Sequence, residues 1–121
     1  MAESVILVVE DDQLQAELVA RALHKLAAKV IHANTGTQGW QIIQELVATV
    51  VLLDLALPEM SGIDVANIIR QDGRFADMIL VAMTASNLSE QDFHEVRTLF
   101  NVFIEKPFHM EDLRQLVEGL L

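Results

Sequence analysis

The strongest constraint on the fold of this chain is a series of five short apolar runs separated by segments long enough for one helix each. The runs begin roughly every 20 to 28 residues and cover 5–9, 30–33, 50–53, 78–83 and 102–104. Most are continuous rather than alternating, as expected for strands covered on both faces. This repeat predicts a doubly wound α/β fold, in which a five-stranded parallel sheet with right-handed crossovers lies between two layers of helices.

Helical patterns fill the gaps between the predicted strands. The first helix is expected to begin after Asp12 as its N-cap, with one inward face formed by Leu14, Leu18, Ala22, Leu23 and Leu26. The second is expected over 37–47, with Trp40, Ile43 and Val47 turned inward. Three more helices are predicted at 63–71, after Ser89 with Asp92 at its third position, and after Pro107.

Length and charge narrow the class of protein. The 121 residues suffice for one domain, 1–121, and they carry 18 acidic and 8 basic side chains for a net charge of −10. Such a surface repels nucleic acid. No apolar run is long enough to span a bilayer, there are no cysteines, and the first residues lack the features of a signal peptide. We therefore expect a single cytoplasmic domain without direct nucleic-acid or membrane partners.

Polar side chains follow four of the five predicted strands at the point where each strand ends. Glu10 and Asp11 follow the first, Asp54 the third, Thr84 the fourth and Lys106 the fifth. In doubly wound folds, sites form outside the carboxyl ends of the strands, where the strand order reverses. The sequence therefore predicts that these side chains meet at one edge of the sheet.

The end of the second predicted strand stands apart from this set. It reads His32-Ala33-Asn34 and offers no comparable group, and the four histidines of the chain show no metal-ligand spacing. The sequence therefore assigns the histidines no role.

The residue types at this edge suit phosphoryl transfer. Buried carboxylates are costly unless they are paired or liganded, and several that converge need a compensating cation. Ligation by oxygen alone favours Mg²⁺. A carboxylate nucleophile beside a metal ion, the ammonium of Lys106 and the hydroxyl of Thr84 would be able to take and stabilise a phosphoryl group. We predict that Asp54 is the nucleophile and becomes an aspartyl phosphate.

Four segments together resemble the signatures of response regulator receiver domains. They are VVEDD at 8–12, LDLALPEMSG at 53–62, MTA at 83–85 and KPF at 106–108. Each is weak alone, but they occur in the right order and spacing over essentially the whole chain. The resemblance implies a flavodoxin-like (βα)5 fold with strand order 2-1-3-4-5, and one receiver domain spanning 1–121.

The resemblance also implies roles for the residues at the strand ends. Glu10 and Asp11 would hold Mg²⁺ together with Asp54 and the backbone carbonyl of Ala56. Asp54 would accept its phosphoryl group from a histidine kinase or a phosphotransfer protein. The domain would catalyse its own Mg-dependent phosphorylation and dephosphorylation without being a conventional enzyme. Its output would be a changed affinity for an effector protein or an output domain in a two-component system.

Further roles implied by the resemblance concern the fifth strand and its neighbours. Thr84 and Lys106 would contact the phosphoryl oxygens, and the bond between Lys106 and Pro107 would be cis. Phe103 would act with Thr84 as a conformational switch, because its ring would move inward when the threonine shifts toward the phosphoryl group. Ala56 and Ser86 would tune the access of water to the aspartyl phosphate.

Other classes of protein remain to be weighed. A pseudo-receiver that acts only as a protein-interaction scaffold is the alternative function, although the acidic, threonine and lysine residues argue against it. A phosphatase with an aspartate nucleophile needs a second aspartate two residues on, where this chain has Ala56. A flavodoxin-like redox protein needs a phosphate loop rich in Ser, Thr and Gly after the first strand, where this chain has acids.

Overall fold

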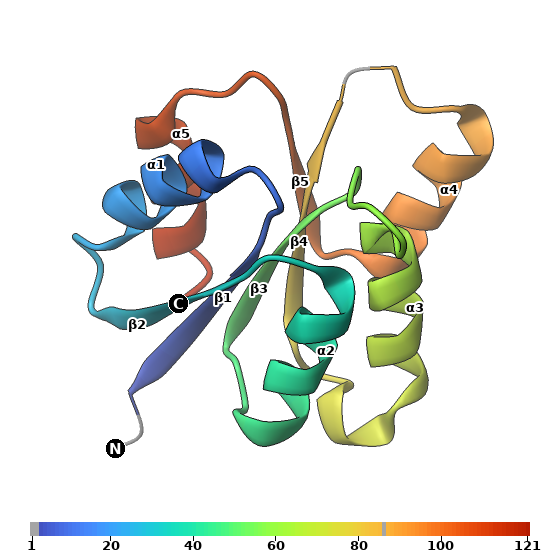
Figure 1. The fold of residues 1–121 in the computed structure, drawn as a ribbon, viewed down its shortest axis with the longest axis horizontal. Helices are drawn as coiled ribbons and strands as arrows, with labels where there is room; N and C mark the ends of the chain where they lie inside the picture. Colours follow the sequence, from blue (N-terminus) through green and yellow to red (C-terminus); the bar gives the residue numbers. More distant parts are fainter. Residues whose placement is uncertain (1–2, 86) are drawn as a thin grey trace.

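All five strands pair in parallel in one sheet, which is the centre of the fold (Figure 1). The computed structural model describes residues 3–85 and 87–121. The sheet has the order β2-β1-β3-β4-β5, which confirms the predicted 2-1-3-4-5. The strands are β1 (Ser4–Val9), β2 (Ala28–Ala33), β3 (Val50–Asp54), β4 (Ile79–Thr84) and β5 (Val102–Glu105).

Helices cover both faces of the sheet and complete the predicted three-layer fold. One face carries α1 (Gln13–Leu23) and α5 (Met110–Glu118). The other carries α2 (Gly36–Glu45), α3 (Gly62–Gln71) and α4 (Glu90–Leu99), with a short 3-10 helix η1 (Gly73–Phe75) after α3. Within the residues that the structure describes, none of the helices is long and apolar enough to cross a membrane.

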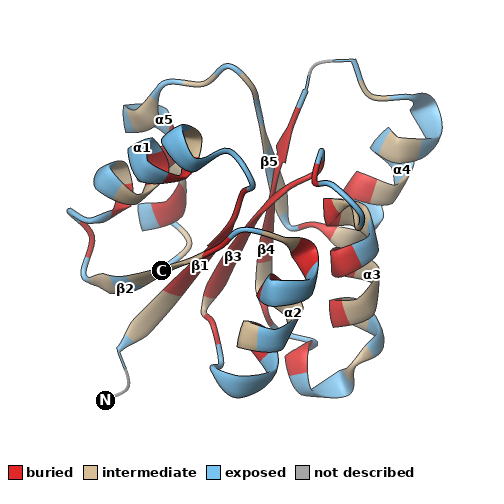
Figure 2. Cartoon of the chain, viewed as in Figure 1, coloured by how far each residue is buried: buried red, intermediate tan, exposed pale blue. Residues whose placement is uncertain are grey.

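The central strands bury side chains toward both helical layers, which explains their continuous apolar runs. Leu7 and Val51 pack into the core under α2, α3 and α4. Ile6 and Leu52, one position away in each strand, pack into the core under α1 and α5. Figure 2 shows the buried residues concentrated in β1, β3 and β4. All of β3 is buried, and its last residue is Asp54.

Side-chain caps begin the helices where the sequence places them. Asp12 accepts a hydrogen bond from the backbone N–H of Gln15 at 2.9 Å, and Ser89 accepts one from Asp92 at 3.1 Å. Each cap satisfies one of the free N–H groups at the start of its helix. Both predicted caps are therefore confirmed, and the cap at Asp12 sets where the chain turns away from the end of β1.

The inward faces predicted for the first two helices are partly wrong. Leu23, Leu26 and Ile43 are buried as predicted. Leu14 and Leu18 are 67% and 39% exposed, because α1 packs through the stripe that contains Val19 and Leu23. Val47 is 79% exposed because α2 ends at Glu45, so that this residue belongs to the connection to β3. Apolar residues lie on more than one face of each of these helices, so their spacing alone does not determine which face is buried.

Candidate functional site

Asp54 is held at the end of β3 by hydrogen bonds to both oxygens of its carboxylate. The residue is only 4% exposed. Its Oδ2 accepts a hydrogen bond from the Lys106 Nζ at 2.9 Å, and its Oδ1 accepts one from the backbone N–H of Ala56 at 2.9 Å. A buried carboxylate with these two donors is compensated in charge and fixed in orientation.

Glu10 lies across from Asp54 and shares its lysine. Its Oε1 accepts a hydrogen bond from the Lys106 Nζ at 3.0 Å, and its Oε2 accepts one from the backbone N–H of Asp12 at 3.3 Å. Glu10 is 1% exposed, so one ammonium group stands between two buried carboxylates. Lys106 thereby joins the ends of β1, β3 and β5.

Asp11 brings a third carboxylate to the same place. One oxygen each from Glu10, Asp11 and Asp54 can be chosen so that all three lie within 4.8 Å of one another. Asp11 is exposed, so this cluster opens to solvent on its side. Three carboxylates against one ammonium leave an excess of negative charge, and oxygen-only donors match a hard divalent cation such as Mg²⁺. The donor set and its charge therefore fit that ion.

The acid–base properties of the three central groups reflect this crowding. Burial and the neighbouring Asp54 carboxylate raise the pKa of Glu10 to about 7, against the effect of Lys106. Burial works to raise the pKa of Asp54 too, but the hydrogen bonds with Glu10, Ala56 and Lys106 outweigh it and hold that pKa below the usual value. Burial opposes the charge on Lys106, yet its two carboxylate partners raise its pKa. Asp54 is therefore ionised at neutral pH.

The loop after Asp54 folds back against that residue, and Gly62 allows the close approach. A Cβ atom at Gly62 would lie 2.5 Å from the carbonyl oxygen of Asp54 and 3.0 Å from the Cα of Leu55. The backbone N–H of Gly62 donates to the Leu55 carbonyl at 3.2 Å. Between them, Glu59 has a φ of 65°, in the left-handed region. The start of α3 therefore packs directly against the backbone of Asp54 and helps to fix its position.

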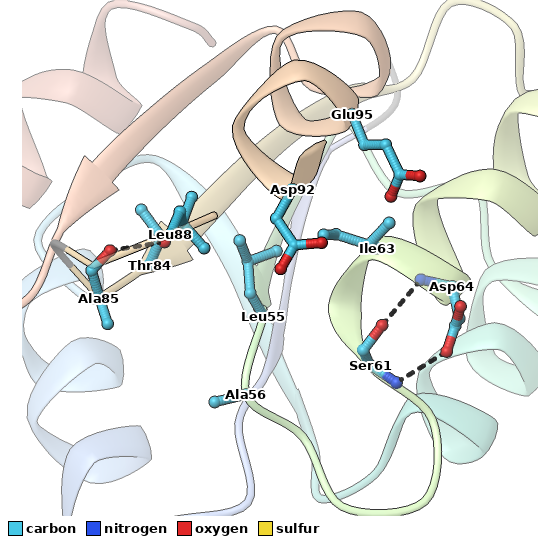
Figure 3. Close-up of a pocket in the computed structure, with 10 residues that line it drawn as sticks. All are labelled: Leu55, Ala56, Ser61, Ile63, Asp64, Thr84, Ala85, Leu88, Asp92 and Glu95. Atoms are coloured by element: carbon cyan, nitrogen blue, oxygen red, sulfur yellow. Dashed lines mark hydrogen bonds between the residues drawn. The ribbon is translucent and has the colours of Figure 1, made fainter. Parts of the chain in front are cut away.

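Thr84 lies at the end of β4, where it lines a pocket between α3 and α4. It is 3% exposed, and its hydroxyl donates to the Ala85 carbonyl at 3.0 Å. The pocket has a volume of about 350 Å³ and also receives Ala56 from the loop after β3 (Figure 3). Its far wall carries Asp92 and Glu95 from α4. The predicted residue Ser86 lies outside the described residues.

The end of β5 contributes the remaining predicted residues. The peptide bond between Lys106 and Pro107 is cis, and the backbone N–H of Lys106 donates to the Thr84 carbonyl at 2.7 Å. Phe103 is 42% exposed and meets Phe93 of α4 edge to face, with ring centroids 6.0 Å apart. The inward movement of the Phe103 ring is predicted for the phosphorylated state and stays a prediction; here the ring has an aromatic partner on α4.

Two long-range polar contacts, one beside the site and one at the opposite edge of the sheet, were not predicted from the sequence. The His32 ring on β2 donates from Nε2 to the backbone carbonyl of Glu10 at 2.8 Å. Arg70 on α3 donates to the Leu99 carbonyl at 2.9 Å and to the side chain of Asn101 at 2.9 Å, and so ties α3 to the start of β5. Both contacts join residues from distant parts of the chain. The sequence carries no local signal for such pairs, whereas the strand-end rule does identify the acidic cluster.

Comparisons with known proteins agree on one family. The family model described as "Response regulator receiver domain" matches residues 6–118. The chain is 39% identical over 116 residues to the DNA-binding response regulator MtrA of Mycobacterium leprae, covering 96% of this chain and 50% of that protein. It is 27% identical over 118 residues to the chemotaxis protein CheY1 of Helicobacter pylori, covering 96% and 95%.

A solved structure shows the same architecture. The chemotaxis protein CheY4 of Vibrio cholerae superposes with a TM-score of 0.88 at 21% identity, covering 99% of this chain and 100% of that one. By contrast, the chain spans about half the length of several curated relatives that it matches.

Proposed function

The chain belongs to the response regulator receiver family, and we propose that it is a phosphorylation-dependent switch in which Asp54 accepts the phosphoryl group. The observation that carries the proposal is the bridge from Lys106 Nζ to the carboxylates of Asp54 and Glu10, at 2.9 and 3.0 Å, with Asp11 beside them. A structural ion pair needs one carboxylate. The surplus acids are explained if they serve a cation and a phosphoryl group.

The proposed reaction is an in-line displacement at phosphorus. An oxygen of the ionised Asp54 side chain attacks the phosphoryl group of a phosphohistidine. The P–N bond breaks, and its electron pair returns to the imidazole nitrogen. The lowered pKa of Asp54 supports this role, because the attacking carboxylate must be deprotonated at neutral pH.

Several residues would stabilise the charge on the transferred group. Glu10, Asp11 and Asp54 would hold Mg²⁺ with the carbonyl of Ala56, and the bound ion would supply positive charge against the phosphoryl oxygens. Lys106 would move its ammonium from the carboxylate bridge to a phosphoryl oxygen. No large movement is needed, because its Nζ already lies 2.9 Å from the Asp54 carboxylate.

Thr84 and Phe103 would pass the change on to the surface. The Thr84 hydroxyl donates its hydrogen bond to the neighbouring Ala85 carbonyl, and it could donate to a phosphoryl oxygen instead. A shift of Thr84 would alter the space beside Phe103, which is paired to Ala82 of the adjacent strand and lies against Phe93 of α4. Such a packing element with two arrangements could convert phosphorylation into a new affinity for a partner.

The partners follow from the family and from the charge of the chain. The donor would be a histidine kinase or a phosphotransfer protein. The downstream partner that responds to phosphorylation would be an output domain or a separate effector protein, since some relatives are DNA-binding regulators about twice as long. With a net charge of −10, this segment itself would not bind nucleic acid. We propose one receiver domain over 1–121 that works in the cytoplasm.

A melting experiment tests the proposed site. The chain is heated with Mg²⁺ alone and with Mg²⁺ plus beryllofluoride, a mimic of the phosphoryl group. The melting temperature should rise with Mg²⁺ and rise again with the mimic, because both bind the folded site. Asp54→Ala should lose the second rise. If neither addition changes the wild type, the domain is the alternative, a scaffold that is not phosphorylated.

A further inference from the structure

Glu10 is held by hydrogen bonds at its side chain and at both ends of its backbone. Its side chain contacts Lys106 and the backbone N–H of Asp12. Its backbone N–H donates to the Ala33 carbonyl at 3.0 Å, one step beyond the last pair of β1 and β2. Its carbonyl accepts from His32 Nε2 at 2.8 Å. Of these contacts, the one from His32 is made by a side chain outside the cluster at the ends of β1, β3 and β5.

The His32 contact replaces a ladder hydrogen bond where the sheet has ended. The paired register of β1 and β2 stops at Val9 and Ala33, so the Glu10 carbonyl lies beyond the regular ladder. The carbonyl of the buried Glu10 needs a donor, and a carbonyl oxygen can only accept, so Nε2 of His32 carries the proton. The ring stands on the edge strand β2 and reaches across to the end of β1.

This bond fixes more than one atom, because a peptide unit is rigid. The Glu10 carbonyl oxygen and the backbone nitrogen of Asp11 lie in the same plane. A donor that holds that oxygen therefore sets the rotation of the plane between the two acidic residues. The Asp11 side chain leaves from the next Cα and is exposed, so its direction depends on the backbone that carries it.

We propose that His32 is a positioning residue for the metal site, which acts by fixing the Glu10–Asp11 peptide so that both carboxylates point at one cation. The inference rests on the proposed function, since it concerns the same Mg²⁺ site. Removing a residue that hydrogen-bonds to a metal ligand and fixes its orientation commonly weakens metal binding. His32 contacts the backbone carbonyl of Glu10 rather than a ligand side chain, and it does not touch the ion.

A purely structural role for His32 makes a different prediction. If its only effect is to satisfy a carbonyl, removing the ring lowers the melting temperature and leaves the Mg²⁺ affinity of the folded protein unchanged. If it positions the ligands, the Mg²⁺ dissociation constant rises even where the protein is fully folded. The affinity of the folded chain therefore separates the two roles.

The test is a calorimetric Mg²⁺ titration of the whole chain after treatment with a chelator, at a pH above the raised pKa of Glu10. His32→Leu keeps the bulk and removes the donor, and it should weaken Mg²⁺ binding about tenfold. His32→Gln carries an N–H at nearly the same reach and should recover most of the affinity. If His32→Leu does not fold, His32→Asn replaces it, because its amide is too short to reach. His94→Leu, on the exposed part of α4, is the matched control and should bind as the wild type does.

The outcomes separate the inference from the proposed function. A wild type that binds Mg²⁺, a weakened His32→Leu and a restored His32→Gln support the inference. If wild type and His32→Leu bind Mg²⁺ equally well, His32 does not position the site, and the proposed function stands. A wild type that binds no Mg²⁺ overturns both.

Discussion

The ammonium of Lys106 lies 2.9 Å from Oδ2 of Asp54, although 52 positions separate the two residues in the sequence. The same nitrogen lies 3.0 Å from Oε1 of Glu10, 96 positions away. The parallel order of β1, β3, β4 and β5 produces this meeting, because it brings the carboxyl ends of all four strands to one edge. The chemistry of the site therefore depends directly on the topology of the sheet.

Removing the shared ammonium should leave two buried carboxylates without their cation. Lys106→Ala is expected to lower the free energy of unfolding by about 1–3 kcal/mol without Mg²⁺, because the site can relieve part of the cost by taking up a proton. Added Mg²⁺ should restore much of the loss. Urea denaturation with and without Mg²⁺ measures both effects.

The matched control for this change is an exposed ion pair. Arg74 contacts Asp72 at 2.7 Å on the surface, and Arg74→Ala should change stability little and show no response to Mg²⁺. Equal losses in Lys106→Ala and Arg74→Ala would contradict the account of the buried bridge.

Mg²⁺ affinity should increase with pH up to about 7 and then level off. The pKa of Glu10 is raised to about 7, so below that pH a proton occupies a carboxylate that the cation needs. As the pH rises through 7, Glu10 loses this proton and the competition ends. Calorimetric Mg²⁺ titrations at a series of pH values measure the curve.

A variant identifies the group responsible for this pH dependence. Glu10→Gln cannot titrate, so it should bind Mg²⁺ more weakly and with little pH dependence between about 5.5 and 8. A wild-type affinity that is constant over this range would show that protonation of Glu10 does not compete with the cation.

Replacing Gly62 even by alanine should destabilise the fold and disturb Asp54. A Cβ atom there would lie 2.5 Å from the Asp54 carbonyl oxygen, and that oxygen belongs to the backbone and cannot rotate away. Gly62→Ala is expected to cost about 1–3 kcal/mol of stability and to slow phosphorylation by displacing Asp54. Thermal melting and the initial rate of labelling by acetyl phosphate measure the two effects.

Gly73 is a matched control for the substitution itself. A Cβ atom there meets nothing within 4 Å. Gly73→Ala should therefore keep the labelling rate and leave stability unchanged or slightly higher. If both variants behave alike, steric crowding at Asp54 is not the reason for the glycine.

Arg70 should stabilise the connection from α4 to β5 through the shape of its guanidinium. It donates to the Leu99 carbonyl, to the Met78 carbonyl at 2.8 Å and to the Asn101 side chain. A lysine keeps the charge but cannot serve these diverging acceptors, so Arg70→Lys is expected to cost about 1–3 kcal/mol. Urea denaturation checks this, with the exposed Arg21→Lys as the control. A loss below that of the control would contradict the role.

The sequence predicts the parts of the site that lie at the ends of the strands. Glu10, Asp54, Thr84 and Lys106 each come at the end of an apolar run, and a parallel sheet necessarily collects such residues at one edge. Hydrophobic spacing and capping chemistry are local signals, so the alternation of strands and helices and caps such as Asp12 were likewise predictable. The strand order was expected from the resemblance to receiver domains.

The missed features depend on details that the sequence does not encode locally. The contact from His32 to Glu10 requires the register of β1 against β2, and the fit at Gly62 requires the path of the loop after Asp54. Leu14 was expected to face inward, but the packing of α1 selects a neighbouring stripe. The contact of Phe103 with Phe93, ten residues earlier on α4, likewise requires the placement of α4 beside β5. Each outcome depends on the relative placement of two elements.

Direct mapping of the phosphoryl group tests the central claim. The chain is incubated with acetyl phosphate and Mg²⁺, and the product is examined by intact mass and by peptide mass spectrometry after borohydride reduction of acyl phosphates. We expect one phosphoryl group per chain, located on Asp54, with none on Asp54→Asn and none when a chelator removes the metal. A wild type that takes no label, or an Asp54→Asn variant labelled at the wild-type rate, would contradict it.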